Sequence, residues 1–200
     1  MKGGFSIKDS CRVATRQYLN LTALMGGIAI LLTLWAWGQP LICTCGYVQF
    51  WVGSIWSSGN SQHIADWYTL SHLIHGLMIV PLGRLLAPRL SFNWLFAIAI
   101  ATGVAWEIVE HTQWVLGQFR ATNVNQGYLG DSVLNAVADY IFMLIGFFVA
   151  SRLPTSWTIA LIVLLEIIAA VFARDSFLLT TLMLIYRVEV IEAWQQQIKL

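Results

Sequence analysis

Charged residues are scarce in this sequence, which has 11 Lys and Arg and 10 Asp and Glu among 200 residues. Soluble domains carry about 25% charged residues, so the 10% found here excludes a soluble protein with a single core. Disorder requires low hydrophobicity and high net charge, whereas this chain is 58% apolar with a net charge of +1. Without a basic stripe, nucleic acid is excluded as a partner. We therefore expect one membrane domain over residues 1–200, with membrane lipids as its partners.

Motifs of familiar hydrolases are absent as well. The sequence has no H-E-x-x-H, which excludes a site-two-type metalloprotease. It has no G-x-S-x-G, the motif around the nucleophilic serine of α/β hydrolases. Any site in this chain depends on how its helices are arranged, because no single motif provides one.

Long apolar runs are what the sequence does contain. A helix that crosses a bilayer needs about 20 mostly apolar residues. The sequence predicts an all-α, polytopic transmembrane helical bundle with five to six spans. The last run is apolar only as far as Tyr186, which is short for a span. The predicted spans are residues 20–38, 71–87, 92–110, 131–151, 155–173 and 176–190.

Basic residues are unevenly distributed between the two sides of these spans. Cytoplasmic loops of membrane proteins carry an excess of Lys and Arg. With a cytoplasmic N-terminus, only Arg120 and Arg174 fall on the outer side. The other basic residues fall on the cytoplasmic side, and this orientation is the predicted one. They are Lys2, Lys8, Arg12, Arg16, Arg84, Arg89, Arg152, Arg187 and Lys199.

The predicted outer loop, residues 39–70, is long and contains no Lys or Arg. Loops of this length without secondary structure of their own are usually functional. Cys43 and Cys45 lie in it, separated by one residue. Four interpretations stay open for this pair: a strained redox disulfide, an intermolecular bond, a ligand pair for a soft metal such as Cu(I), or two reduced thiols.

Polar residues gather on the outer side of the predicted bundle. All four histidines and five acidic residues belong to the outer ends of three predicted helices or precede them. Deep in the fourth span, Asp139 costs about 3 kcal/mol on insertion scales and therefore needs a partner. His72 and His75 share a helix face, as do Glu107 and Glu110. The set comprises His63, Asp66, His72, His75, Glu107, Glu110, His111, Asp131 and Asp139.

This convergence predicts a site for a divalent metal, with Zn²⁺ the best fit to mixed nitrogen and oxygen ligands. Glu107, Glu110 and Asp139 are the predicted catalytic carboxylates, since a carboxylate that does not bind the metal can serve as general base. Simpler roles compete: Asp131 as a helix N-cap, Glu107 and Glu110 as water-exposed acids, and the histidines as interfacial residues. The predicted metal ligands are His72, His75, Glu107, Glu110, Asp131 and Asp139, with His63, Asp66 and His111 as outer candidates.

Three functions follow as hypotheses. The first is a metal-dependent hydrolase acting on a lipid or lipid-linked substrate. The second is a non-catalytic assembly or accessory subunit, in which the polar cluster fixes helix packing. The third is a proton- or cation-binding transporter, for which Glu166 is the one acidic residue that hints at an inward path. Arg174 and Asp175 are expected to form an exposed pair.

Six strings of the sequence are distinctive, namely residues 43–47 (CTCGY), 57–68 (SSGNSQHIADWY), 71–72 (SH), 75–76 (HG), 105–110 (AWEIVE) and 130–135 (GDSVLN). Together they resemble an uncharacterised family of bacterial multi-pass inner-membrane proteins, known as UPF0314 or DUF2585. The likeness covers roughly residues 35–195. It implies a multi-pass protein of the bacterial inner (plasma) membrane, and it implies no activity, cofactor or catalytic residue.

Overall fold

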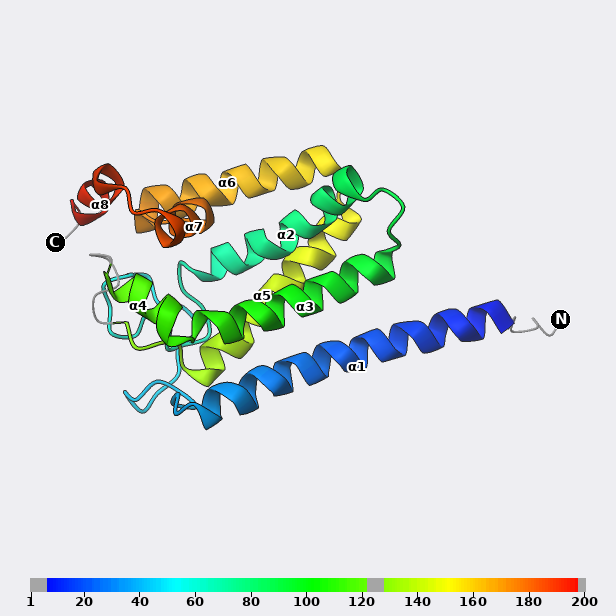
Figure 1. Cartoon of the computed structure of the whole chain (residues 1–200), viewed down its shortest axis with the longest axis horizontal. Coiled ribbons are helices and arrows are strands. Elements are labelled where there is room, and N and C mark those ends of the chain that lie inside the picture. Colours follow the sequence, from blue (N-terminus) through cyan, green and yellow to red (C-terminus); the bar gives the residue numbers. More distant parts are fainter. Residues whose placement is uncertain (1–6, 122–127, 198–200) are drawn as a thin grey trace.

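The computed structural model describes residues 7–121 and 128–197. Within these ranges the chain forms eight helices and no β-strand (Figure 1). Five of these helices are long and apolar enough to cross a membrane: the Gln17–Ala36 part of α1, and α2, α3, α5 and α6. The prediction of an all-α polytopic bundle is confirmed. The helices are α1 (Ile7–Ala36), α2 (Thr69–Leu86), α3 (Phe92–Glu110), α4 (Gln113–Ala121), α5 (Val133–Arg152), α6 (Thr155–Ala173), α7 (Phe177–Ile185) and α8 (Glu189–Gln196).

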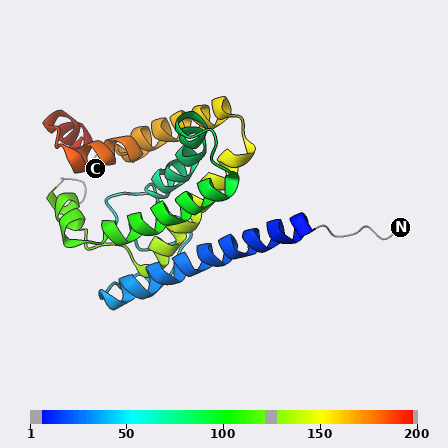
Figure 2. The same ribbon diagram turned by 45° about the vertical axis from the view of Figure 1, so that its right-hand side comes forward.

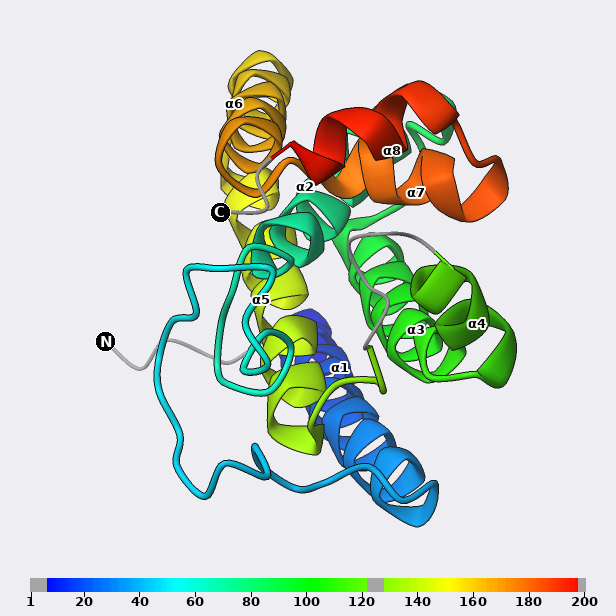
Figure 3. The ribbon, with the colours of Figure 1, turned by 90° about the vertical axis from the view of Figure 1, so that its left-hand side faces the viewer.

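The sixth predicted span, residues 176–190, is not a single helix. Extended backbone at Tyr186 (φ −146°, ψ 116°) separates the nine residues of α7 from the eight of α8. Neither helix approaches the roughly 20 residues that a span needs. Arg187, at the break, donates to Glu192 and to the carbonyl oxygen of Ala121 at the end of α4. These polar contacts keep α7 and α8 beside α4 at one end of the molecule (Figures 1 and 3).

That end, formed by residues 39–68 with α4, α7 and α8, is called the loop end below. Arg187 lies there, which corrects its predicted place on the cytoplasmic side, and Arg120 and Arg174 lie there too. Lys2 and Lys199 are outside the described residues. The basic excess still falls at the opposite end, which the positive-inside rule assigns to the cytoplasm. Its described basic residues are Lys8, Arg12, Arg16, Arg84, Arg89 and Arg152.

α2 and α5 cross at the centre of the bundle with their backbones in contact. A Cβ atom at Gly76 would overlap the carbonyl oxygen of Met143, and one at Gly146 would overlap that of Leu73. Small residues permit this close approach, which drives helix association in lipid, where apolar burial gives little advantage. The contact fixes which turns of α2 and α5 face each other.

α1 lies along one edge of the bundle, against α3 and α5 (Figure 2). Ile30 and Leu34 of α1 are fully buried. The hydroxyl of Tyr140 in α5 donates to the carbonyl oxygen of Ala23 at 3.1 Å. These contacts tie the second half of α1 to the core and leave its first half beyond the other helices.

The long loop folds back over the start of α5 (Figure 3). The first backbone N–H groups of a helix have no partner within it. Here the N–H groups of residues 132, 133 and 134 donate to the carbonyl oxygens of Ser61, Pro40 and Leu41 at 2.9 to 3.1 Å. The side-chain amide of Asn135 also donates to the carbonyl oxygen of His63 at 2.8 Å. The loop is thereby anchored beside the polar cluster described next.

Candidate metal centre

Three carboxylates converge at the loop end. Glu107 and Glu110 come from the last turn of α3, and Asp131 comes from the segment that leads into α5. Each offers an oxygen atom, and these atoms all lie within 4.8 Å of one another. The N-cap of α5 is Ser132, whose hydroxyl accepts from the N–H of Asn135 at 3.2 Å. Asp131 is therefore not the N-cap, and its side chain is free to join the cluster.

Two oxygen atoms of this cluster, Oε2 of Glu107 and Oε2 of Glu110, are buried without a hydrogen-bond partner. The Glu107 side chain as a whole is 1% exposed. Neighbouring carboxylates cannot all be ionised at this separation unless a cation balances them, because like charges repel strongly out of water. The cluster must therefore hold shared protons or a cation.

His72 of α2 connects α3 with α5. Its Nδ1 lies 3.2 Å from Oε1 of Glu107, and its Nε2 lies 3.8 Å from Oδ2 of Asp139. Asp139 also accepts a hydrogen bond from the hydroxyl of Thr69 at 2.9 Å. His72 is thus placed to orient Glu107, in the way that second-shell partners orient metal ligands.

The other three histidines do not join the three carboxylates as ligands. His75 Nε2 pairs with the hydroxyl of Thr102 at 3.2 Å. Both nitrogens of His111 are engaged: Nε2 accepts from the N–H of Asp131 at 3.0 Å, so Nδ1 carries the proton and donates to the carbonyl oxygen of Glu107 at 2.7 Å. His63 lies in the loop beside Cys45. His111 therefore holds Asp131 in place, and His75 lies apart from the cluster.

Asp66 organises the turn before α2. Its carboxylate accepts from the N–H groups of Ser61 at 2.6 Å and Tyr68 at 2.8 Å, and its own N–H donates to Thr69 at 3.0 Å. Burial raises the pKa of Asp66, against the lowering effect of these two backbone N–H groups. With its oxygen atoms already bonded, Asp66 fits a structural role better than a ligand role.

Sequence reasoning missed Tyr128. Its hydroxyl donates to Oδ1 of Asp131 at 2.6 Å, while Arg120 donates to the Tyr128 carbonyl oxygen at 2.7 Å. Burial, followed by the charge of Asp131, raises the pKa of Tyr128 well above its usual value. In the sequence, Tyr128 stands between Gly127 and Gly130 and belongs to no apolar periodicity, so no pattern pointed to it.

Asp175 and Glu166 both hold α7 in place. Asp175 accepts from the N–H of Ser176 and from the hydroxyls of Thr180 and Tyr68 at 2.9 to 3.1 Å. Burial raises its pKa to about 6, so the expectation of an exposed pair with Arg174 is wrong. Both oxygens of Glu166 lie 3.3 Å from the N–H of Leu178, in the first turn of α7.

A partly open cavity of about 250 Å³ adjoins the cluster between α2, α3, α4, α5 and α7. Its polar wall includes His72, Glu110, Asp131 and Asp139, and no Lys or Arg is among the described residues that line it. Aromatic side chains from three helices form much of the remaining wall, namely Trp106, Phe119 and Phe177. The cavity can therefore admit an amphiphilic molecule whose polar part meets the carboxylates.

Comparison with known proteins relates this chain to one family. The model of that family, described as "Protein of unknown function (DUF2585)", matches residues 34–197. The UPF0314 protein of Paracoccus denitrificans is 45% identical over 174 residues, covering 87% of this chain and 90% of its own. That of Rhizobium meliloti is 41% identical over 181 residues, with coverage of 90% and 92%. That of Rhizobium etli strain CIAT 652 is 42% identical over 186 residues, with coverage of 92% and 94%. No solved structure matches.

Proposed function

This chain belongs to the DUF2585 family of proteins of unknown function, and from its own site we propose that it is a metal-dependent hydrolase of a lipid or lipid-linked substrate in the bacterial inner membrane. One observation carries the proposal: Glu107, Glu110 and Asp131 place oxygen atoms within 4.8 Å of one another. Two of these residues keep a buried oxygen without a partner. A divalent cation would satisfy those oxygens and balance the charge.

The donor atoms favour a hard cation. Oxygen ligands suit Mg²⁺ and Mn²⁺ best, whereas Zn²⁺ favours nitrogen and sulfur. The sequence suggested Zn²⁺ because it counted His72 and His75 as ligands, but His72 faces Glu107 and His75 faces Thr102. We therefore assign Glu107, Glu110 and Asp131 as ligands of Mn²⁺ or Mg²⁺, with Zn²⁺ as the competing ion.

The proposed reaction is hydrolysis by metal-activated water. A divalent cation held by Glu107, Glu110 and Asp131 would supply a water ligand of lowered pKa and would polarise the bond to be cleaved. His72 and Asp139 line the same cavity, and we propose them as acceptors of the proton. The aromatic wall of Trp106, Phe119 and Phe177 supports an apolar substrate portion. An ester or phosphoester linkage at the head of a lipid would meet both surfaces.

The test measures metal binding to the purified, detergent-solubilised protein. Bound Mn²⁺, Mg²⁺ and Zn²⁺ are quantified by mass spectrometry, and Mn²⁺ affinity is obtained by titration. Glu110→Gln removes one ligand charge while keeping its shape, and we expect it to weaken Mn²⁺ binding more than about tenfold. Glu189→Gln, which alters an exposed acid on α8, is the matched control and should bind like the wild type. A folded wild type that binds none of the three ions at millimolar concentration refutes the proposal.

A second function is favoured by the hydrogen bonds around Asp66 and Asp139. Those carboxylates bond to Ser61, Tyr68 and Thr69 in the manner of a packing network. If the cluster serves only packing, the chain would act as a non-catalytic assembly or accessory subunit. In that case neither the wild type nor Glu110→Gln would contain bound metal, and the substitution would alter only the thermal stability. The transporter hypothesis relied on Glu166 as the acidic residue of an inward path. Both oxygens of Glu166 instead face the N–H of Leu178 at the start of α7, which weakens that hypothesis.

A further inference from the structure

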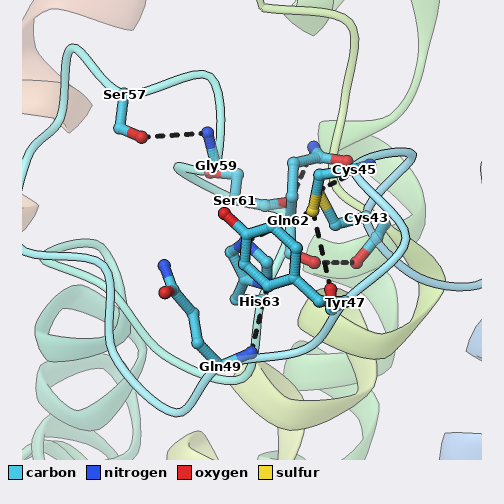
Figure 4. Close-up of a disulfide and its surroundings, with 10 residues drawn as sticks. Cys43, Cys45, Tyr47, Gln49, Ser57, Gly59, Ser61, Gln62 and His63 are labelled. Carbon is cyan, nitrogen blue, oxygen red and sulfur yellow. Dashed lines mark hydrogen bonds between the residues drawn. A yellow bond between two sulfur atoms is a disulfide. The ribbon is translucent and has the colours of Figure 1, made fainter.

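A second group of reactive side chains lies in the loop, outside the proposed hydrolytic site. Cys43 and Cys45 are joined by a disulfide, with their Cα atoms 5.1 Å apart. Nε2 of His63 lies 3.9 Å from Sγ of Cys45 (Figure 4). We propose that this disulfide is a thiol–disulfide exchange centre that oxidises dithiols, with Cys45 as the sulfur attacked first and His63 as the hydrogen-bond donor that stabilises the Cys45 thiolate when it is released.

The two cysteine residues differ in exposure. Cys45 is exposed, whereas Cys43 is only 5% exposed. Exchange proceeds by attack of a thiolate on one disulfide sulfur, and access decides which sulfur is attacked. An incoming thiolate can therefore reach Cys45 and is kept from Cys43.

The backbone is arranged to receive Cys43 as the first leaving group. The N–H of Cys45 lies 3.2 Å from Sγ of Cys43 and points toward it. Hydrogen bonding to the charged form of a group stabilises that form, so this N–H favours the Cys43 thiolate once the disulfide opens. When a thiolate attacks Cys45, the sulfur that leaves is therefore the one whose thiolate this N–H stabilises.

The orientation of His63 sets its role at Cys45. The backbone N–H of Gln49 donates to Nδ1 of His63 at 3.3 Å, so in the neutral ring the proton resides on Nε2. That nitrogen is the one directed at Cys45. The ring of Tyr47 stacks on the His63 ring with centroids 5.3 Å apart, and the His63 side chain is buried. His63 is therefore held as a fixed donor toward Cys45 (Figure 4).

The proposed steps balance in atoms and electrons. The first thiolate of a dithiol forms a bond to Sγ of Cys45 while the Cys43–Cys45 bond breaks, leaving Cys43 as a thiolate that takes up a proton. The second thiol of the substrate then loses its proton to water, and the resulting thiolate attacks the substrate sulfur bound to Cys45. That step forms the substrate disulfide and releases Cys45 as a thiolate. The Nε2–H of His63 stabilises this thiolate by hydrogen bonding, and the thiolate then takes up a proton from water. The dithiol loses two electrons and two protons, and the Cys43–Cys45 disulfide gains them.

The experiment uses full-length protein carrying Cys11→Ser, so that Cys43 and Cys45 are its only cysteines. Reduction by millimolar dithiothreitol and by a dithiol peptide is followed by quenching, alkylation and mass spectrometry. Cys43→Ser and Cys45→Ser each leave one thiol, whose reaction with an aromatic disulfide reagent gives its reactivity. We expect Cys45 to react at least about tenfold faster than Cys43, because access controls exchange. Equal reactivity of the two thiols overturns the proposal.

A second variant tests His63 separately. His63→Gln should slow release of the mixed disulfide by at least about tenfold, because hydrogen bonds to charged groups are among the strong ones. The first attack on Cys45 should keep its rate. Ser58→Ala, an exposed change in the same loop, is the control. If His63→Gln fails to fold, the comparison of Cys43→Ser with Cys45→Ser decides alone. A wild-type disulfide that resists millimolar dithiothreitol, or protein isolated as two thiols holding Zn²⁺ or Cu⁺, overturns the proposal.

Discussion

At the scale of residues, the buried acids of this protein fall into two kinds. Asp66 and Asp175 have their oxygens bonded to backbone N–H groups and hydroxyls, and each fixes a turn beside a helix start. Glu107 and Glu110 instead keep a buried oxygen without a partner. Buried polar groups that lack partners are rare in native proteins and call for an explanation. The second kind therefore marks where a cation or a shared proton is needed.

The raised pKa of Asp175 predicts how the stability of the folded protein depends on pH. Its pKa is about 6 in the folded protein, against 3.8 for the unperturbed carboxyl, because burial disfavours the charged form. The folded state therefore binds more protons between these values, and stability falls as pH rises from about 4 to about 6 and levels off above. A shift of this size corresponds to about 3 kcal/mol. Thermal unfolding in detergent from pH 4 to 8 measures it.

The matched variant is Asp175→Asn. An amide oxygen can accept from Ser176 and Thr180, and the amide nitrogen can donate to the Tyr68 hydroxyl. We expect Asp175→Asn to lose this part of the pH dependence and to be at least as stable as the wild type at pH 7. Asp175→Ala, which loses every one of these hydrogen bonds, should be less stable than both. An unchanged pH slope in Asp175→Asn would show that Asp175 is not its source.

At the scale of elements, the contact of α2 with α5 controls the geometry of the site. Both helices supply polar residues, His72 from α2 and Asp139 from α5, and these face each other because the backbones touch near Gly76 and Gly146. Packed helix interiors transmit small displacements rather than absorbing them. A side chain added at this contact should therefore disturb both stability and the site.

Gly146→Ala tests this contact. Its new methyl group would meet the carbonyl oxygen of Leu73, a backbone atom that cannot move alone. Overpacking of this kind costs about 1–3 kcal/mol, which should appear as a lower unfolding temperature in detergent. Gly117→Ala in α4 is the control, because nothing lies within 4 Å of its added Cβ. Alanine there should raise helix stability by about 0.5–1 kcal/mol. Equal effects of the two substitutions would contradict the close approach.

The helices themselves could be predicted, and their rotations could not. Runs such as 92–110 and 155–173 coincide with α3 and α6, because apolar length alone indicates a membrane helix. Topology likewise brings His72 and Glu107 to the same end. Which histidine faces which group depends on the rotation of α2 against α5. Glycine contacts fix this rotation, and they join residues far apart in the sequence, Gly76 with Met143 and Gly146 with Leu73. Sequence spacing therefore treated His72 and His75 alike, although only His72 meets Glu107.

The start of α4 and the break between α7 and α8 also escaped prediction. The predicted spans leave residues 111–130 without a helix, whereas α4 begins there, with two residues between it and the end of α3. The last apolar run looked like the beginning of a span. It stops at Tyr186 because Arg187 bonds to Glu192 and to the end of α4. Contacts between distant segments decided both outcomes.

At the scale of the whole molecule, five spans would place the start of α1 and the end of α8 on opposite sides of the membrane. The positive-inside rule assigns the end with Arg84, Arg89 and Arg152 to the cytoplasm. Alkaline phosphatase fused after Gln197 or after Ser58 should therefore be active, whereas a fusion after Pro88 should be inactive. Green fluorescent protein at the same positions should give the reverse pattern. A fluorescent fusion after Gln197, together with an active phosphatase after Ser58, would show that residues 176–190 span the membrane after all.

The carboxylate cluster also bears on how the protein is made. Helices of a polytopic protein are inserted in chain order, so α2 and α3 reach the bilayer before α5 does. Until α5 is inserted, His72 and Glu107 lack the neighbours that α5 provides. Polar side chains without partners are costly in lipid. An interrupted chain would thus present exposed polar groups within the membrane, a feature by which proteases and chaperones can recognise an unfinished protein. Insertion of α5 brings Asp139 to His72 and so supplies the missing contact.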